Sequence, residues 1–162
     1  MTDGIAIRPA NFQECELLGD LAYRSKAYWG YSAEFMEACR AELSVSERDI
    51  ANSRRSYVLV ESDRKILGYY TLERLSAVEC ELEALFVEPE HIGQGIGRQL
   101  IEHAKSNARE MGTEAMLIQE DPNAAHFYLA VGGVRTGERE SGSIPGRYLP
   151  EYKISLSTEN AA

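Results

Sequence analysis

The chain has 162 residues, of which 44% are hydrophobic and 27% charged, and its formal net charge is −9. This length suits one domain that buries an apolar core without disulfides or a structural metal. The acidic excess disfavours a nucleic-acid partner, because it repels phosphate backbones. No run of about 18 apolar residues is present, so we expect no membrane partner. The opening segment lacks the features of a secretory signal, which predicts a cytoplasmic location.

Three cysteines, Cys15, Cys39 and Cys80, are spread widely along the chain. Their number is odd and no Cys-x-x-Cys pair occurs, which indicates reduced thiols. The three histidines do not cluster with them, so we expect no metal site.

A short strand and three helices are predicted in the first third of the chain. Weak alternation indicates a strand over Ile5–Arg8. Leucines and alanines at helical spacing predict a helix over Phe12–Lys26, which Asn11 is suited to cap. Ser32 is expected to cap a second helix. The stretch Ser46–Asp49 has the form of a capping box and begins a short third helix.

The rest of the chain mixes further strands with two helices. The predicted helices run from Gly95 to Met111 and over Asn123–Val131. The predicted strands are Tyr57–Glu61, Ile66–Leu75, Ala77–Val87, Ala115–Gln119, Val134–Glu138 and Tyr148–Leu156. Because hairpins alternate with crossover helices, we expect an α/β fold with a mixed sheet. We expect one domain over residues 1–157 and a disordered tail at 158–162.

The most informative segment is a glycine-rich turn between a strand and a helix. Gly93, Gly95 and Gly97 alternate there, so several backbone amides can face one point at the positive end of the helix. This pattern favours a cradle for phosphate. No Lys follows as in a P-loop, and Arg98 and Leu100 stand where a dinucleotide fingerprint needs glycine. The alternative is a tight turn without a ligand.

The segments around this turn carry a wider pattern. It consists of a strand ending in Val87-x-Pro89, the glycine turn, a helix, a strand, and then Asn123, Phe127-Tyr128 and Gly132. This succession resembles the GNAT superfamily of acetyl-CoA-dependent N-acetyltransferases over nearly the whole chain. The resemblance implies a mostly antiparallel sheet of about seven strands, splayed at its centre and flanked by about four helices.

The same resemblance implies that acetyl-CoA is the co-substrate. The glycines of the family signature Arg/Gln-x-x-Gly-x-Gly/Ala match Gly95 and Gly97, while Ile92 stands where the family has Arg or Gln. We expect Gln94 or Arg98 to compensate for the lost side chain. The residues expected to contact acetyl-CoA are Leu85, Phe86, Val87, Ile92, Gly93, Gln94, Gly95, Ile96, Gly97, Arg98, Asn123, Phe127 and Tyr128.

Tyr128 matches the tyrosine that protonates the departing sulfur of CoA in this superfamily. The alternative is a half-buried structural tyrosine. Asn123 matches the asparagine that bonds the pantetheine arm, and it also suits a helix N-cap. A backbone amide near Phe86 or Val87 is expected to stabilise the oxyanion.

The general base has several candidates. An amine attacks only in its neutral form, so a base must remove a proton. Glu81 falls where some family members carry a catalytic glutamate, and Glu83 lies about 7 Å further along the same strand face. Both are candidates, and Glu120 is a reserve. The alternative for the strand carboxylates is that they form a solvated face. The other basic side chains, His91 and His126, are assigned to the turn and to a helix surface and are weaker candidates for the base.

The acceptor pocket in this superfamily lies between the first two helices and the last hairpin. The candidate acceptor-binding residues are Tyr28, Trp29, Tyr31 and Arg147. The aromatic rings suit a cationic or apolar acceptor, and a lone guanidinium suits a carboxylate. Core packing and a surface salt bridge are the structural alternatives.

We therefore predict an N-acetyltransferase that acts directly on a primary amine of a small molecule. The stretch from Ser141 to Pro150 is long enough to cover the site, which disfavours a protein substrate. The alternatives are a peptide or protein N-acetyltransferase and a non-catalytic acyl-CoA sensor. The sequence does not identify the acceptor and leaves a homodimer open.

Overall fold

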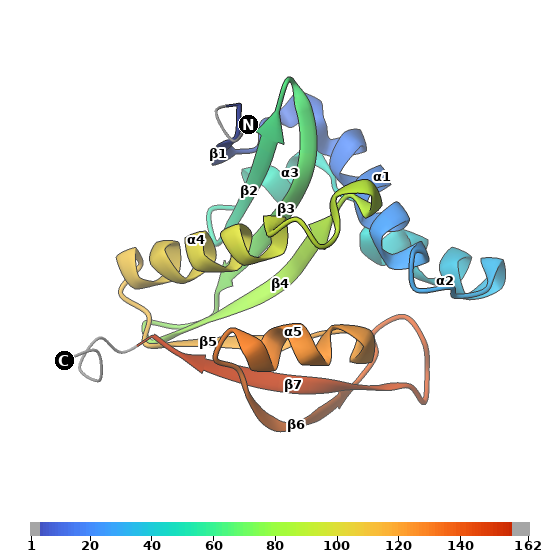
Figure 1. Ribbon diagram of the computed structural model, residues 1–162. Helices are drawn as coiled ribbons and strands as arrows, with labels where there is room; N and C mark the ends of the chain where they lie inside the picture. Colours follow the sequence, from blue (N-terminus) through green and yellow to red (C-terminus); the bar gives the residue numbers. More distant parts are fainter. Residues whose placement is uncertain (1–3, 157–162) are drawn as a thin grey trace.

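In the computed structural model, which describes residues 4–156, seven strands form one sheet with helices on both of its faces (Figure 1). The strands are β1 Ala6–Pro9, β2 Arg55–Ser62, β3 Lys65–Arg74, β4 Glu79–Val87, β5 Ala115–Gln119, β6 Val134–Glu140 and β7 Tyr148–Ser155. Their spatial order is β1-β2-β3-β4-β5-β7-β6. Only β4 and β5 run parallel within this order, so the predicted mixed, mostly antiparallel sheet is confirmed. The predicted tail at 158–162 lies outside the described residues.

The helices occur in the predicted order. They are α1 Cys15–Ala27, α2 Ala33–Leu43, α3 Glu47–Ala51, α4 Ile96–Glu110 and α5 Ala125–Ala130, with single 3-10 turns η1 Phe12–Glu14, η2 Pro89–His91 and η3 Pro122–Ala124. No helix in the described part of the chain is long and apolar enough to cross a membrane.

Two of the predicted helix starts differ in detail from the structure. The side chain of Asn11 caps the turn η1, and α1 begins only after it. Asn123 is not a helix N-cap, because it lies inside η3, whose N-cap Asp121 accepts the Asn123 amide, and α5 begins only after Ala124. Pro122 directly after the cap supplies the helical φ that favours this start.

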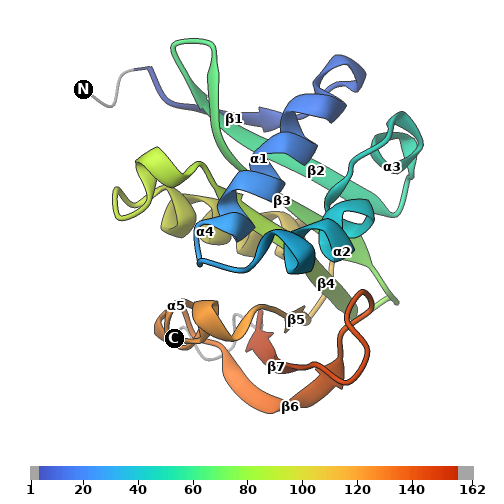
Figure 2. The same cartoon turned by 90° about the vertical axis from the view of Figure 1, so that its right-hand side faces the viewer.

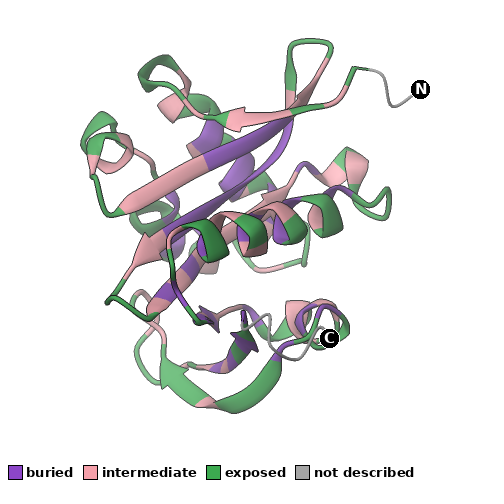
Figure 3. Ribbon diagram, turned by 90° about the vertical axis from the view of Figure 1, so that its left-hand side faces the viewer, coloured by how far each residue is buried: buried purple, intermediate pink, exposed green. Residues whose placement is uncertain are grey.

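One face of the sheet is covered by α4 and α5. The predicted stripe of Ile96, Leu100, Ala104 and Ala108 is buried and packs into the core with residues of β3 and β4. Figure 3 shows this buried stripe turned toward the sheet while the outer side of α4 is exposed. The opposite face of the sheet is covered by α1 and α2, which pack on Leu59 of β2 and on β3 (Figure 2).

The sheet opens at its centre between β4 and β5. Their parallel pairing ends at Leu82 and Ile118, although β4 continues to Val87. Neighbouring residues of β3 pair with Leu82 and Ala84, so Glu83 is an extra residue that forms a β-bulge. The bulge bends β4 away from β5, which confirms the predicted splay.

Candidate active site

A cleft of about 420 Å³ lies where β4 and β5 separate. Twelve of the predicted site residues line it, namely Trp29, Leu85, Phe86, Val87, Ile92, Gly93, Gly95, Gly97, Arg98, Asn123, Phe127 and Tyr128. The cleft therefore brings the end of β4 and the glycine turn that follows it together with the start of α5, which lies much later in the sequence.

The glycine turn has the geometry of an anion site. Gly93 and Gly95 have φ values of 86° and 85°, and Gly95 is the N-cap of α4. No side chain caps this helix and no acidic residue lies in its first turn, so its first amides and its positive dipole end are available to an anion. A Cβ atom placed on Gly95 meets nothing within 4 Å, which leaves open space above the turn. These features fit the pyrophosphate of acetyl-CoA.

The side chains of the turn divide between cleft, surface and core. Ile92 and Arg98 line the cleft. The Gln94 side chain instead pairs with Nδ1 of His91 at 2.9 Å, so the prediction that Gln94 replaces the family's Arg or Gln is not supported. Ile96 is buried in the core against the sheet, so only its backbone belongs to the turn.

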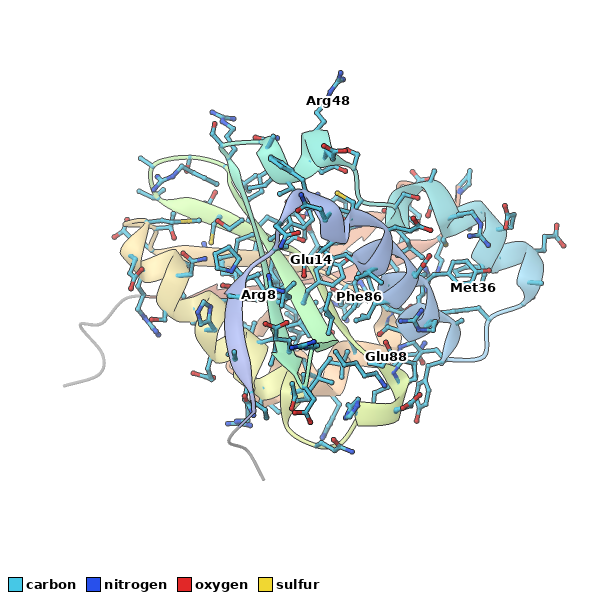
Figure 4. The ribbon with its side chains drawn as sticks, turned by 90° about the horizontal axis from the view of Figure 1, so that it is seen from above. Arg8, Glu14, Met36, Arg48, Phe86 and Glu88 are labelled. Carbon is cyan, nitrogen blue, oxygen red and sulfur yellow. The ribbon has the colours of Figure 1, made fainter. Side chains whose placement is uncertain are left out.

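The end of β4 directs its backbone into the opening. The Glu88 amide donates to the Leu67 carbonyl of the segment paired with it, at 2.8 Å. Because amides alternate along an antiparallel strand, those of Leu85 and Val87 face the open side and that of Phe86 faces β3. Of the two predicted oxyanion donors, only the amide of Val87 therefore points into the opening. The Phe86 side chain packs under α1, and Glu88 follows it at the strand end (Figure 4).

The last turn of α1 is anchored to both sides of the opening. Arg24 donates two hydrogen bonds to the Glu88 carboxylate, from Nε at 2.8 Å and Nη2 at 2.7 Å. These bonds hold the pKa of the buried Glu88 below its ordinary value. Lys26 Nζ lies 3.3 Å from Oδ2 of Asp121, beyond the end of β5.

Tyr128 and Glu120 form a hydrogen-bonded pair inside the cleft. The hydroxyl of Tyr128, which is 1% exposed, donates to Glu120 Oε2 at 3.4 Å. Burial raises the pKa of Glu120 to about 7, although the Asp121 amide and the Lys26 charge oppose it. Burial and the negative charge of Glu120 raise the pKa of Tyr128 well above its ordinary value. The carboxyl group therefore changes charge near neutral pH while the phenol keeps its proton.

The two strand carboxylates predicted as bases lie outside the lining of the cleft. Glu83 Oε1 is 3.2 Å from Arg55 Nε, and Glu81 Oε2 is 3.9 Å from Arg139 Nη2. Burial raises the pKa of both, and the neighbouring Glu73 adds to this effect. The structure thus brings the reserve candidate Glu120 into the cleft and leaves the base role of Glu81 and Glu83 a prediction.

Asp121 gathers four side chains at the wall of the cleft. Its Oδ2 atom accepts from the Tyr31 hydroxyl at 2.5 Å and lies 3.5 Å from Arg147 Nη2. Its Oδ1 atom accepts from the Asn123 amide group at 2.8 Å. Lys26 completes the set. Arg147 is therefore not a lone guanidinium, because it pairs with Asp121 and with the Tyr31 hydroxyl, the latter at 2.9 Å, and its role in acceptor binding stays a prediction.

The remaining predicted acceptor residues separate in the structure. Trp29 lines the cleft, whereas Tyr28 is 54% exposed and outside its lining. Tyr31 stacks on Phe35 of α2 with ring centroids 4.2 Å apart.

Four further residues line the cleft that sequence reasoning did not single out as site residues, namely Ser25, Lys26, Asp121 and Ala124. A signal for Asp121 was present, because Asp before Pro is a common helix start. Lys26 offered no such signal, since a lysine in the last turn of a helix is ordinarily solvated.

Comparisons with known proteins agree with this geometry. The profile of the family described as "Acetyltransferase (GNAT) domain" matches residues 53–132. The peptidyl-lysine N-acetyltransferase YjaB of Escherichia coli K12 is 31% identical over 146 residues, which cover 89% of this chain and 92% of that protein. The chain also shares the fold of the Thermoplasma acidophilum PaiA N-acetyltransferase in complex with coenzyme A (TM-score 0.78, 20% identity, 93% and 98% of the two chains covered). An aminoglycoside 6'-N-acetyltransferase with coenzyme A shares it as well (TM-score 0.70, 14% identity, 94% and 97% covered).

Proposed function

The chain belongs to the GNAT family of N-acetyltransferases, and from this premise we propose that it transfers acetyl directly to a primary amine of a small molecule. The observation that carries the proposal is the Tyr128–Glu120 pair, which shares one cleft with the uncapped start of α4. We thus propose, in addition to the reaction, that the acceptor is a small molecule and that the protein is cytoplasmic.

Acetyl-CoA would be held by the backbone of the turn and by the start of α5. The amides around Gly95 and Gly97 would hold the pyrophosphate, while Asn123 and Phe127 would contact the pantetheine arm. When bound, acetyl-CoA supplies the acetyl group as an activated thioester. The amides of Leu85 and Val87 would stabilise negative charge on the carbonyl oxygen.

Two side chains of the cleft would transfer protons during the reaction. An alkyl ammonium has a pKa near 10.4, so a base must take its proton before or during attack on the thioester. Glu120 would accept that proton, directly or through water. Tyr128 would donate its own proton to the departing sulfur and recover one from Glu120. The ammonium gives up two protons in all. One would pass through Glu120 and Tyr128 to the thiol of CoA, the other would leave to solvent, and the pair would end in its starting state.

The loop between β6 and β7, residues 141–147, favours a small acceptor. Ser143 donates to Glu42 of α2 at 2.8 Å, and Ile144 packs against the apolar core under α1 and α2. Arg147 reaches Tyr31 in the link between these helices. A loop held in this way would leave little room for a bulky protein substrate on the acceptor side. A peptide lysine is the second candidate, because the YjaB relative is a peptidyl-lysine N-acetyltransferase.

The test is turnover with acetyl-CoA and two acceptor sets, one of small primary amines and one of lysine peptides. Release of free CoA gives the rate, and mass spectrometry identifies the product. We expect acetylation of at least one small amine at a higher kcat/KM than any peptide. Acetylation confined to peptides would establish the second candidate. Retained CoA binding without turnover on either set would indicate an acyl-CoA sensor.

A further inference from the structure

Asp121 is the point where the end of α1 and the link after it meet the distant β6–β7 loop. Lys26 comes from α1, Tyr31 from the link between α1 and α2, and Arg147 from the β6–β7 loop. All three contact the same oxygen, Oδ2, of a side chain that is 7% exposed. Without this carboxylate, two cations would face each other beside a hydroxyl.

The second oxygen fixes the carboxylate to the wall of the cleft. Oδ1 accepts from the backbone amide of Asn123 at 2.9 Å and from its side-chain amide at 2.8 Å. Burial alone would raise the pKa of Asp121, but the bonds from Tyr31 and Asn123 and the charge of Lys26 outweigh it and hold the pKa below its ordinary value. The group is therefore an anion at neutral pH, with a fixed orientation.

The contact orders two segments on the acceptor side. The guanidinium of Arg147 lies 5.0 Å from the ring centroid of Phe35 and 5.4 Å from that of Tyr31, so the ion pair seats it over both rings. Glu120, whose Oε1 atom accepts from the Asp121 amide at 3.4 Å, is the preceding residue in the chain. A substitution of Asp121 is therefore expected to affect the positions of both the β6–β7 loop and the proposed base Glu120.

We propose that Asp121 is a positioning residue, which holds the β6–β7 loop and the α1–α2 link together so that the acceptor amine is presented to Glu120. This inference rests on the proposed function, since it assumes that the acceptor enters beside this loop. Asp121 itself does not touch the reacting atoms in this arrangement.

Asp121→Asn tests the role with little change in shape. The substitution keeps an oxygen for the Asn123 amide but removes the charge that binds Lys26 and Arg147. We expect KM for the amine found in the acceptor panel to rise at least about tenfold, while the Kd of CoA changes less than about threefold. Glu138→Gln is the control, because it removes only an exposed 3.8 Å pair with Arg135 on β6. Tyr31→Phe should act in the same direction as Asp121→Asn and more weakly.

A second readout needs no acceptor. Trypsin cleaves after arginine, and mass spectrometry reports cleavage of the Arg147–Tyr148 bond in the intact chain. We expect this bond to be cut several-fold faster in Asp121→Asn than in the wild type or in Glu138→Gln. Unchanged acceptor KM together with unchanged cleavage would overturn the inference. Faster cleavage in a protein whose wild type acetylates no amine would contradict the proposed function while supporting the hold on the loop.

Discussion

Tyr128 of α5 and Glu120 at the end of β5 share a hydrogen bond of 3.4 Å inside the cleft. The bond joins a phenol whose pKa is raised well above its ordinary value to a carboxyl group whose pKa is about 7. A donor that stays protonated thus lies next to an acceptor that changes charge under physiological conditions. Both residues are therefore direct targets for mutation.

Tyr128→Phe is expected to lower kcat by roughly 10²-fold or more, because it removes one general acid. The Kd of CoA should stay nearly constant, since the ring is retained. Tyr152→Phe is a matched control, as this ring is also buried and stacks on Tyr128 at 6.0 Å. Similar small losses in both variants would exclude Tyr128 from the chemistry.

Glu120→Gln is expected to remove a base that ionises near pH 7. The activity deficit relative to the wild type should grow from pH 6 to pH 8, because wild-type Glu120 loses its proton over this range. Profiles of kcat/KM against pH for Glu120→Gln, Glu81→Gln and Glu83→Gln would rank the three candidates. A larger deficit in either strand variant would move the base role to that strand.

The same carboxyl group makes stability depend on pH. Its pKa is higher in the folded chain than its ordinary value, so the folded state binds the proton more tightly and loses stability as the pH rises toward 7 and above. Glu120→Gln should therefore have a higher Tm than the wild type at pH 8 and a similar Tm at pH 5. Thermal unfolding at both pH values measures this, and equal Tm differences at the two would refute it.

Gly95→Ala is expected to weaken CoA binding by obstructing the open space above the turn. The positive φ of 85° adds a cost in stability, so a mutation here does not leave the fold unaffected. Gly112→Ala is the control, because Gly112 has a φ of 83° and equally open surroundings after the other end of α4. Calorimetry with CoA should show loss of binding in Gly95→Ala alone, at comparable Tm values. Equal CoA affinity in both variants would place the pyrophosphate elsewhere.

Arg24→Gln is expected to destabilise the protein by about 1–2 kcal/mol at pH 7, because Glu88 would remain buried without its charged partner. The pKa of Glu88 is lowered in the folded chain, so this stabilisation is present above its ordinary pKa and is lost as the pH falls through the folded value. The difference in Tm should therefore shrink in acid. Arg40→Gln, which removes an exposed pair with Glu37 on α2, should change Tm little at any pH. Equal changes in Tm for the two mutations would mean that the Arg24–Glu88 pair stabilises the protein no more than an exposed pair does.

Local patterns were sufficient to predict the elements and the glycine turn. The stripe on α4 follows from i, i+4 spacing, and Ser32 caps α2 as its chemistry predicts. The contents of the cleft depended on long-range packing instead. Glu120 enters it because β4 bends away at the bulge on Glu83, and no periodicity in the sequence marks a bulge. The partners of Asp121 come from residues 26, 31 and 147, which only the folded topology brings together.

Two ion pairs from the last turn of α1 limit the width of the central opening. Arg24 binds the residue that follows β4, and Lys26 binds a residue that follows β5. Since both cations project from one helical turn, the strand ends cannot move further apart without the rupture of an ion pair or a bend in the helix. The two ion pairs thus oppose a widening of the gap. An extended ligand loses conformational entropy when it binds, but the protein loses little, and this preorganisation favours tight binding.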